Sequence, residues 1–259
     1  MNMYYVRHQS CGFSLVELSI LLVILGLLTG GILGGQALIR AAEMRAITND
    51  MSRYRAANLM FKDKYFSLPG DMTNAYSFWQ GKDTCTANSV ASPSNNNGCN
   101  GNGDGTIDVT TGESFKVWMH LKQAGLVEGG YTGYYPANWG GQTYFHCFYI
   151  GTNIPGARGS STSFFHLYSM PLVARGWFTG DVNGYRNRIM YSDYARTPLT
   201  SAEAWNIDTK LDDGRPGLGA VTANQSGANC SVGGSTTTAT AEYNLSANTG
   251  CTGLDFAVE

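Results

Sequence analysis

A glycine-rich loop in the first half of the chain carries oxygen-bearing side chains at alternate positions. The loop reads Asn100-Gly-Asn102-Gly-Asp104-Gly105-Thr106-Ile107-Asp108. Calcium takes about 6–8 oxygen ligands, and alternate side chains can converge on one ion where a glycine lets the chain turn sharply. The pattern therefore predicts a calcium site. Its candidate ligands are Asn100, Asn102, Asp104, Thr106, Asp108 and Glu113.

The same loop resembles the first nine positions of an EF-hand-type calcium loop, with glycine sixth and an apolar residue eighth. It departs from that pattern at the twelfth position, where Thr111 stands instead of a bidentate glutamate. We expect Glu113, two residues later, to act as the substitute. Asn-Gly repeats also form ordinary turns, so a hydrogen-bonded loop without an ion is the alternative.

A single carboxylate, Glu17, stands at the near edge of a long apolar run. No charged residue occurs among the 22 positions from Leu18 to Ile39, a length that lets a helix cross a bilayer. A carboxylate at the edge of the hydrocarbon costs on the order of a few kcal/mol and usually has a partner or a function. Glu17 therefore either pairs with a positive charge or reaches the headgroup water.

The junction before this run, Gly12-Phe13-Ser14-Leu15-Val16-Glu17, resembles the processing site of type IV prepilins and type II secretion pseudopilins. In that family a membrane peptidase cuts after the glycine, methylates the new terminal amine and leaves the apolar helix on the mature chain. The resemblance implies cleavage between Gly12 and Phe13. It also implies that Glu17 serves assembly by pairing with the terminal amine of Phe13, on the same or a neighbouring subunit.

Two features depart from the family pattern. No Lys or Arg directly precedes Gly12, and glycines replace the proline that is common in the helix. An ordinary secretory signal, with a small-x-small cleavage site after the run, is the competing interpretation. Thr29-Gly30-Gly31 and Gly34-Gly35-Gln36 match such a site imperfectly, and the exported chain would then begin near residue 36.

Five cysteines follow the predicted leader, and their spacing suggests two disulfides. Pairing of near neighbours joins Cys85 to Cys99 and Cys230 to Cys251, each across a loop rich in Asn, Ser, Thr and Gly. Loops with so few apolar residues cannot order themselves by burial, so a covalent link is expected in an oxidising compartment. This pairing leaves Cys147 as the odd cysteine, and other disulfide connectivities stay open.

The chain lacks the residue patterns of common enzyme sites. The histidines have no metal-ligand spacing with the cysteines, and no nucleophile-elbow, phosphate-binding or dinucleotide-binding motif occurs. His146 and Cys147 are adjacent, but adjacent residues of a strand point to opposite faces, so we do not expect them to act as a catalytic pair. Asp212 and Asp213 could suggest paired catalytic carboxylates, but adjacent acids at a turn are usually solvated. We expect no enzyme activity, and the net charge of -2 gives no sign of nucleic-acid binding.

One long helix is expected to carry the N-terminal features into a globular domain. Apolar residues recur every three or four positions after the apolar run, among charged residues, which predicts an amphipathic helix packed on a core. The stripe consists of Met44, Ile47, Met51, Tyr54, Asn58, Phe61 and Tyr65. Leu68-Pro69-Gly70 ends the helix. It would run from Phe13 to about Phe66, roughly 80 Å at 1.5 Å per residue.

Five glycines interrupt the apolar part of this helix. They are Gly26, Gly30, Gly31, Gly34 and Gly35. Each costs roughly 1 kcal/mol relative to alanine in a helix in water. The spacing indicates either close packing against neighbouring helices or a segment that can partly unwind.

The rest of the chain predicts an α+β head in which the long helix packs on an antiparallel β-sheet, with short helices and long loops. A short helix is expected after Thr110-Thr111-Gly112-Glu113, which has capping-box spacing, with Gly125 at its end. Aromatic strands are expected between Val127 and Phe178, and a second capped helix between Thr200 and Gly214. Residues 217–259 are expected to be a tail held by the last cysteine pair.

An aromatic cluster among glycines has two interpretations, a stacking surface for a sugar or host ligand, or packing within the sheet. Its members are Tyr131, Tyr134, Tyr135 and Trp139.

These features divide the chain into a leader (1–12), a transmembrane and filament-core helix (13–39), its amphipathic continuation (40–66) and a head domain (67–259). Arg7 is the nearest strong positive charge before the span, so the N-terminus is expected in the cytoplasm. The head is then expected in the periplasm of a bacterium, beyond the inner membrane, and later in a filament.

The resemblance implies a structural subunit, a pilin or pseudopilin of a type IV pilus or type II secretion filament. Its expected partners are the prepilin peptidase, other pilin or pseudopilin subunits, the inner-membrane platform protein and, indirectly, the assembly ATPase. The alternative is a minor tip pilin whose head binds a surface or carbohydrate. An exported membrane-anchored enzyme is a third possibility.

Overall fold

The computed structural model describes residues 14–79, 100–108, 112–133, 148–157, 160–169, 187–193, 198–224, 230–233, 240–246 and 249–258 of the 259-residue chain. Helices in these ranges are α1 (Leu15–Tyr65), α2 (Ala75–Trp79), α3 (Glu113–Gln123) and α4 (Ser201–Leu211). Strands are β1 (Ser163–Ser169), β2 (Asn187–Asp193), β3 (Leu199–Thr200), β4 (Val221–Asn224), β5 (Ser231–Val232), β6 (Glu242–Tyr243), β7 (Gly250–Cys251) and β8 (Gly253–Ala257).

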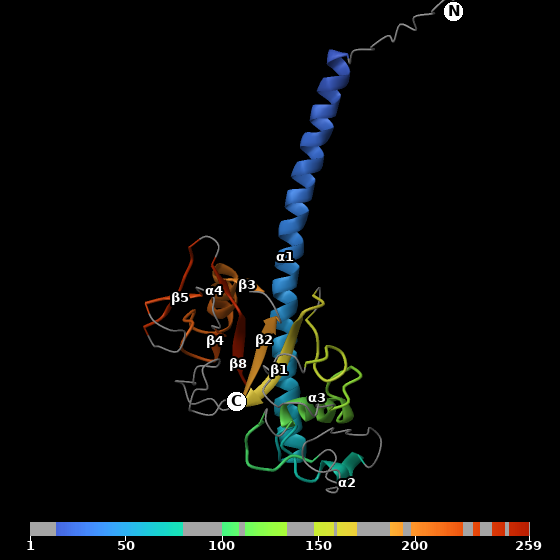
Figure 1. Cartoon of the computed structure of the whole chain (residues 1–259), viewed down its shortest axis with the longest axis vertical. Coiled ribbons are helices and arrows are strands. Elements are labelled where there is room, and N and C mark those ends of the chain that lie inside the picture. The colour runs from blue at the N-terminus through green and yellow to red at the C-terminus, as the bar shows by residue number, and fades with distance from the viewer. Residues whose placement is uncertain are drawn as a thin grey trace, which may run out of the picture. The chain divides into compact units, whose positions relative to one another are not determined.

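The long N-terminal helix predicted from the sequence is present as α1, a continuous helix of 51 residues (Figure 1). The chain divides into two compact units, Met1–Glu43 and Met44–Glu259, and α1 contributes to both. In the first unit every large apolar side chain from Leu15 to Ile39 is exposed. This part of α1 is long and apolar enough to cross a membrane.

In the second unit, α1 buries one face in the core of the head. Ile47, Met51, Tyr54 and Phe61 are each at most 4% exposed, which confirms the amphipathic stripe. The ring of Tyr54 packs edge-on against α3 and β1, with centroids 5.0 Å from Trp118 and 5.2 Å from Phe165. Residues three or four apart share a helix face, so this periodicity places the stripe against the sheet.

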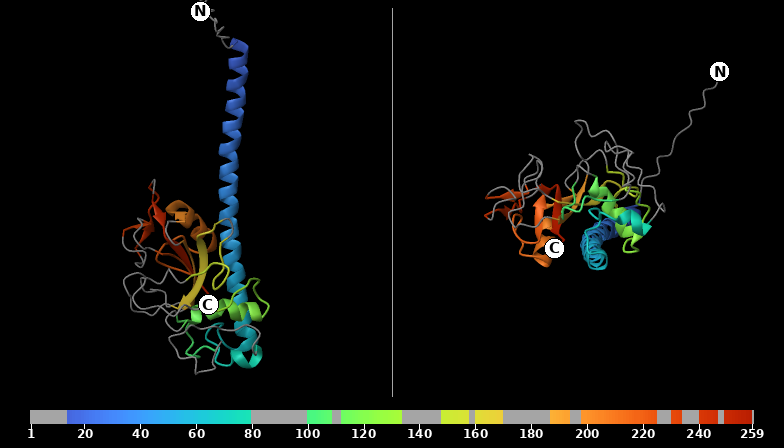
Figure 2. Two further views of the ribbon diagram at one scale, coloured as in Figure 1. Left: turned by 45° about the vertical axis from the view of Figure 1, so that its right-hand side comes forward. Right: turned by 90° about the horizontal axis from the view of Figure 1, so that it is seen from below.

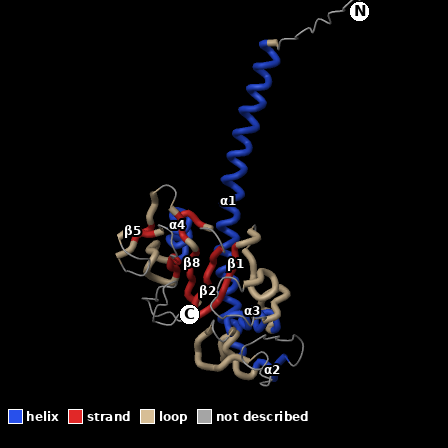
Figure 3. The backbone as a smooth tube through the Cα atoms, viewed as in Figure 1, coloured by secondary structure: helices blue, strands red, loops and turns tan. Residues whose placement is uncertain are grey.

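An antiparallel sheet forms the other side of that core (Figures 2 and 3). Its strand order is β1-β2-β8-β4, and each neighbouring pair is antiparallel. The expectation that residues 217–259 form only a tail is wrong, because this region supplies β4 and β8. In β8 every residue is buried, and because successive side chains point to opposite faces, both faces of the sheet are covered at this strand.

Only part of the expected strand region can be compared. The segment 163–168 is within β1, and Ile150 forms an isolated bridge with Ile154. Residues 142–147 of the strand expected at 142–150, and the whole strand expected at 177–179, lie outside the described residues.

The helix predicted after Gly112 is α3, but its expected cap is wrong. The N-cap residue is Gly112, in a left-handed conformation with φ 76°, and no side chain of the described residues caps the helix. Glu113 is therefore the first helical residue, and its carboxylate is free to bond elsewhere. Gly125 ends the helix as expected, with φ 75° and its N–H donated to the Lys122 carbonyl.

The capping box predicted for α4 is confirmed. The Thr200 hydroxyl accepts the Glu203 N–H at 3.2 Å, and the Glu203 carboxylate accepts the Thr200 N–H at 2.8 Å. The two side chains satisfy backbone donors that would otherwise be unpaired at the start of the helix. The Thr-x-x-Glu spacing alone was enough to locate this helix.

Candidate functional site

The predicted cleavage residues Gly12 and Phe13 lie outside the described residues, which begin at Ser14. The carboxylate of Glu17, close to this junction, bonds the first described residue. Glu17 Oε2 accepts the Ser14 N–H at 2.9 Å, and the Ser14 carbonyl accepts the Leu18 N–H at 3.1 Å. Glu17 therefore caps the first turn of α1. The Ser14-x-x-Glu17 spacing was a capping signal that the sequence interpretation missed.

This cap places the Glu17 carboxylate beside the point where cleavage would create a terminus. Phe13 is the residue directly before Ser14, so its amine would arise one residue from the N–H that Glu17 already binds. A carboxylate at the N-terminus of a helix is also favoured by the helix dipole.

The five glycines of α1 stand in open space. A Cβ atom added at any of these positions would meet no atom within 4 Å. The helix is continuous through them, so the partly unwound alternative is not seen here.

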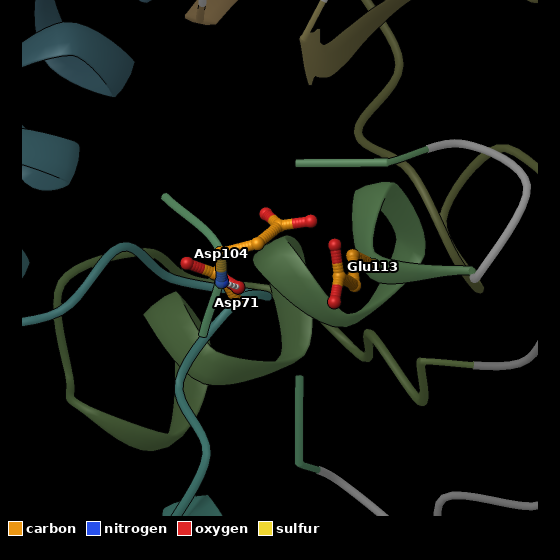
Figure 4. A group of neighbouring side chains, drawn as sticks. All are labelled: Asp71, Asp104 and Glu113. Atoms are coloured by element: carbon orange, nitrogen blue, oxygen red, sulfur yellow. Dashed lines mark hydrogen bonds between the residues drawn. The ribbon is translucent and has the colours of Figure 1, made fainter. Parts of the chain in front are cut away.

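Three carboxylates from separate segments meet at the start of α3 (Figure 4). Asp71 follows the exit of α1, Asp104 belongs to the glycine-rich loop, and Glu113 opens α3. Each offers one oxygen, and these oxygens lie within 4.8 Å of one another. Asp71 and Glu113 are buried, at 3% and 1% exposure, while Asp104 is exposed.

Asp71 organises the glycine-rich loop through backbone hydrogen bonds. Its carboxylate accepts the N–H groups of Gly103 at 2.6 Å, Asp104 at 3.1 Å and Gly105 at 2.9 Å. Gly103 and Gly105 have φ values of 77° and 82°, which L side chains rarely adopt. The loop glycines therefore allow the backbone to wrap around a buried acid.

Glu113 holds the two ends of the loop in the same way. Its carboxylate accepts the Asn102 N–H at 2.9 Å and the Asp108 N–H at 3.0 Å. The Asp108 carbonyl in turn accepts the Glu113 N–H at 3.1 Å. The missing side-chain cap of α3 is thus explained, because Glu113 is used by the loop.

The pKa values of the three acids shift in different directions, because two of the acids are buried and one is exposed. Burial raises the pKa of Asp71, partly offset by its bonds to loop N–H groups, and the Asp104 charge raises it further. Burial also raises the pKa of Glu113, with the Asp71 charge acting in the same direction. The hydrogen bond from Thr106 lowers the pKa of exposed Asp104. A divalent cation would relieve both the burial cost and the mutual repulsion of these carboxylates.

Lys116 supplies a positive charge close to this group. Its Nζ donates to the Asn100 carbonyl at 2.7 Å. Burial lowers the pKa of Lys116, and the Glu113 charge opposes that shift.

The structure brings together two of the six predicted calcium ligands, Asp104 and Glu113. Asp71 joins them, and its only sequence signal is an acid directly after Pro69-Gly70. Gly70 has φ 89°, and a Cβ there would lie 2.6 Å from the Glu113 carbonyl, so this glycine brings Asp71 close to α3.

Two of the other predicted ligands, Asn102 and Thr106, lie next to this group, because the side chain of each donates a hydrogen bond to the Asp104 carboxylate, at 2.9 Å and 2.6 Å. Asn100 Oδ1 accepts the Tyr76 N–H, and Asn102 Oδ1 accepts the Asp104 N–H. Asp108 lies outside the acidic group.

The structure joins Cys230 to Cys251 in a disulfide with a Cα–Cα distance of 4.8 Å. This is the second pair expected from the sequence. The first pair, Cys85 and Cys99, lies outside the described residues, as does Cys147 with its neighbour His146.

Part of the aromatic cluster can also be placed. Tyr131 is buried, and its ring centroid lies 6.2 Å from that of Trp118, so this residue packs in the core. Tyr134, Tyr135 and Trp139 lie outside the described residues.

A second acidic group, Asp208, Asp212 and Asp213, lies at the end of α4. Asp212 and Asp213 accept backbone N–H groups from Val221 and Arg215, as acids in turns commonly do.

A scan against protein-family models finds no match for this chain, and comparisons with curated proteins and with solved structures find none either.

Proposed function

We propose that this chain is a structural subunit of the type IV pilin or type II secretion pseudopilin kind. The N-terminal part of α1 holds it in a bacterial inner membrane, with the head in the periplasm, and the same helix then packs into a filament. The observation that supports this most is the division of α1 into an exposed apolar part and a part that fills the core of the head. The fifteen exposed Leu, Ile and Val side chains between Leu15 and Ile39 need lipid or other helices as surroundings.

The open glycine positions support helix packing as the mode of assembly. Small residues let helix backbones approach closely where lipid gives no hydrophobic driving force between helices. The partners that follow from this proposal are the prepilin peptidase, other pilin or pseudopilin subunits, the platform protein and, indirectly, the assembly ATPase.

Processing is tested by the mass of the mature chain. The wild-type protein should begin at a methylated Phe13, and Gly12→Val should retain residues 1–12. A mature chain that begins near residue 36, or one that keeps Met1, would contradict the proposal.

Assembly is tested by comparing two substitutions of Glu17. Glu17→Gln keeps an oxygen that can cap the Ser14 N–H but removes the charge, whereas Glu17→Ala removes both. If the charge pairs with the terminal amine, both variants should be processed and both should assemble poorly. Normal incorporation of Glu17→Gln into filaments would show that Glu17 acts only as a helix cap.

Abundance separates a shaft subunit from the alternative tip pilin. A shaft subunit should be plentiful in purified filaments, and its deletion should abolish them. A scarce subunit, whose loss leaves filaments that no longer bind a surface or carbohydrate, would favour the tip role.

We also propose that the group of Asp71, Asp104 and Glu113 binds calcium, which would fix the glycine-rich loop to α3. An ion that binds only the folded state stabilises it by about 2.7 kcal/mol at 100 times its Kd. For a head of this size that corresponds to a rise in Tm of roughly 5–10 °C. The measurement is the thermal unfolding of the purified protein in EDTA and in excess calcium.

Two substitutions in the loop make this test specific. Asp104→Asn changes an exposed member of the group and should remove most of the calcium-dependent rise in Tm. Asp108→Asn changes an acid outside the group and should keep it. Equal Tm values in EDTA and calcium for the wild-type protein would leave the hydrogen-bonded loop without an ion as the correct interpretation.

A further inference from the structure

A fully buried carboxyl connects α4 to the small β5–β6 sheet. Asp208 lies on the inner face of α4 with 0% exposure. Its Oδ2 accepts the Tyr243 hydroxyl of β6 at 2.9 Å, and its Oδ1 accepts the Gly214 N–H at 3.2 Å. Tyr243 also pairs with Ser231 of β5. The Asp208 carboxyl therefore connects a helix and a sheet that lie far apart in sequence.

The β5–β6 sheet has a second, covalent attachment that does not depend on Asp208. Cys230, directly before β5, forms the disulfide with Cys251 of β7, and β7 pairs with β3 at the start of α4. The Cys230 carbonyl accepts the Asn244 N–H at 2.9 Å. Loss of the Asp208–Tyr243 bond would therefore loosen β5 and β6 locally while the disulfide keeps this region on the head.

Two further acids make the charge on Asp208 unfavourable. Carboxylate oxygens of Asp212 and Asp213 lie within 4.8 Å of an Asp208 oxygen. Burial raises the pKa of Asp208 to about 7, the bonds from Tyr243 and Gly214 partly offset this, and the charges of Asp213 and Asp212 add to it. Burial keeps the pKa of Tyr243 far above its ordinary value, so its hydroxyl remains a donor.

The other elements packed on α4 add little charge at this connection. In the described part of the chain, the elements that contact α4 most closely are β3, β4, β6 and β7. Among their residues, Glu242 of β6 is exposed and Cys251 of β7 is in the disulfide. On α4 itself, Glu203 is held by the Thr200 cap and Lys210 is exposed, while Arg215 in the following turn is also exposed.

We propose that Asp208 and Tyr243 form a pH-dependent latch that holds the β5–β6 sheet on α4 in acid and loosens as the pH rises to neutrality. The latched form carries a protonated Asp208, and the open form exposes this carboxyl to water, where it ionises near its ordinary pKa of 3.8. Between that value and about 7 the open form binds fewer protons, so opening becomes more favourable as the pH rises. Above about 7 both forms are ionised and the dependence ends. This inference does not depend on filament assembly.

Amide hydrogen exchange of the full chain in detergent micelles and EDTA tests the latch between pH 5 and pH 8. After correction for the intrinsic pH dependence of exchange, protection of β5 and β6 should fall by up to about tenfold per pH unit from pH 5 to 7 and then level off. Protection of α3 should not follow this pattern. Protection of β5 and β6 that is independent of pH would overturn the proposal.

Matched substitutions identify the group responsible. Asp208→Asn cannot ionise but keeps an acceptor for Tyr243, so its protection should be constant between pH 5 and 7. Glu242→Gln removes the exposed acid next to Tyr243 and should behave like the wild-type protein. A pH dependence that survives in Asp208→Asn would overturn the proposal.

A measurement on the wild-type protein remains decisive if Asp208→Asn fails to fold. The carboxyl ¹³C shift of Asp208 should titrate near pH 7 in the folded protein. Titration near pH 4 would show that its charge carries no penalty in the fold, and the latch would be excluded.

Discussion

Burial shifts the pKa values of acids and bases in opposite directions, and this head contains an example of each. Asp208 is an acid that becomes harder to ionise, with a pKa of about 7, and His166 is a base that becomes harder to protonate, with a pKa of about 3. The physical cause is the same, because a buried site disfavours the charged form of either group. The two residues therefore give the stability of the head opposite dependences on pH.

His166 predicts a loss of stability in acid. Its ring packs against those of Phe148 and Tyr168, with centroids 4.3 Å and 5.6 Å away, and its Nε2 has no hydrogen-bond partner among the described residues. Between pH 6.5 and about 3 the unfolded chain binds one proton more than the folded chain, so the free energy of unfolding should fall as the pH falls. The slope is at most about 1.4 kcal/mol per pH unit.

The substitution His166→Phe removes this proton without emptying the site. Between pH 7 and pH 5 the free energy of unfolding, measured in urea, should fall by about 2 kcal/mol less in this variant than in the wild-type protein. Identical pH dependences in the two proteins would show that His166 keeps its ordinary pKa in the folded head.

Among the elements, α1 ends in an unusual way. Phe66 follows its last helical residue with φ 54°, a left-handed conformation that glycine usually occupies, and its side chain is 93% exposed. The Phe66 N–H still donates to the Lys62 carbonyl at 2.8 Å. Phe66 thus closes the last turn of the helix through its backbone N–H, while its own side chain stays exposed.

Two phenylalanines near this end should respond very differently to substitution. Phe61 is 0% exposed, and its ring centroid lies 4.5 Å from that of Tyr65 and 6.1 Å from that of Trp79. Phe61→Ala should therefore cost about 3–5 kcal/mol of unfolding free energy. Phe66→Gly should be neutral or stabilising by up to about 1 kcal/mol, because it relieves the left-handed strain. Urea unfolding of both variants checks this pair, and a large loss in Phe66→Gly would show that the exposed ring is needed for folding.

At the scale of the whole molecule, the head is complete only with the second part of α1. The unit Met44–Glu259 contains the stripe residues that pack on the sheet, whereas the apolar side chains of the first unit are exposed. The core of the head is therefore built around a helix that begins in the other unit.

Two truncated chains test this division. A chain that begins at Met44 should fold, because it keeps Ile47, Met51, Tyr54 and Phe61 in the core. A chain that begins at Ser67 loses all four and should not fold cooperatively, since each large buried side chain contributes about 2–5 kcal/mol. Thermal unfolding followed by circular dichroism distinguishes the two, and cooperative unfolding of the shorter chain would contradict this account of the core.

The sequence by itself determined the features that depend on local spacing. The stripe of α1 follows from a helical period, the start of α4 follows from Thr200-x-x-Glu203, and the end of α1 follows from Leu68-Pro69-Gly70. The same kind of reasoning located the glycine-rich loop and two of the acids that meet there. Each of these patterns depends only on residues that are near one another along the chain, so the amino-acid sequence contains all that is needed.

Only the tertiary structure decided which distant segments meet. Asp71 joins Asp104 and Glu113 because the exit of α1 packs against α3, and Tyr243 of β6 reaches Asp208 of α4. The tertiary structure also decided that β8, the last strand of the chain, lies inside the sheet between β2 and β4. Local patterns carry no information on pairing partners, since these are chosen by burial and hydrogen bonding across the whole head.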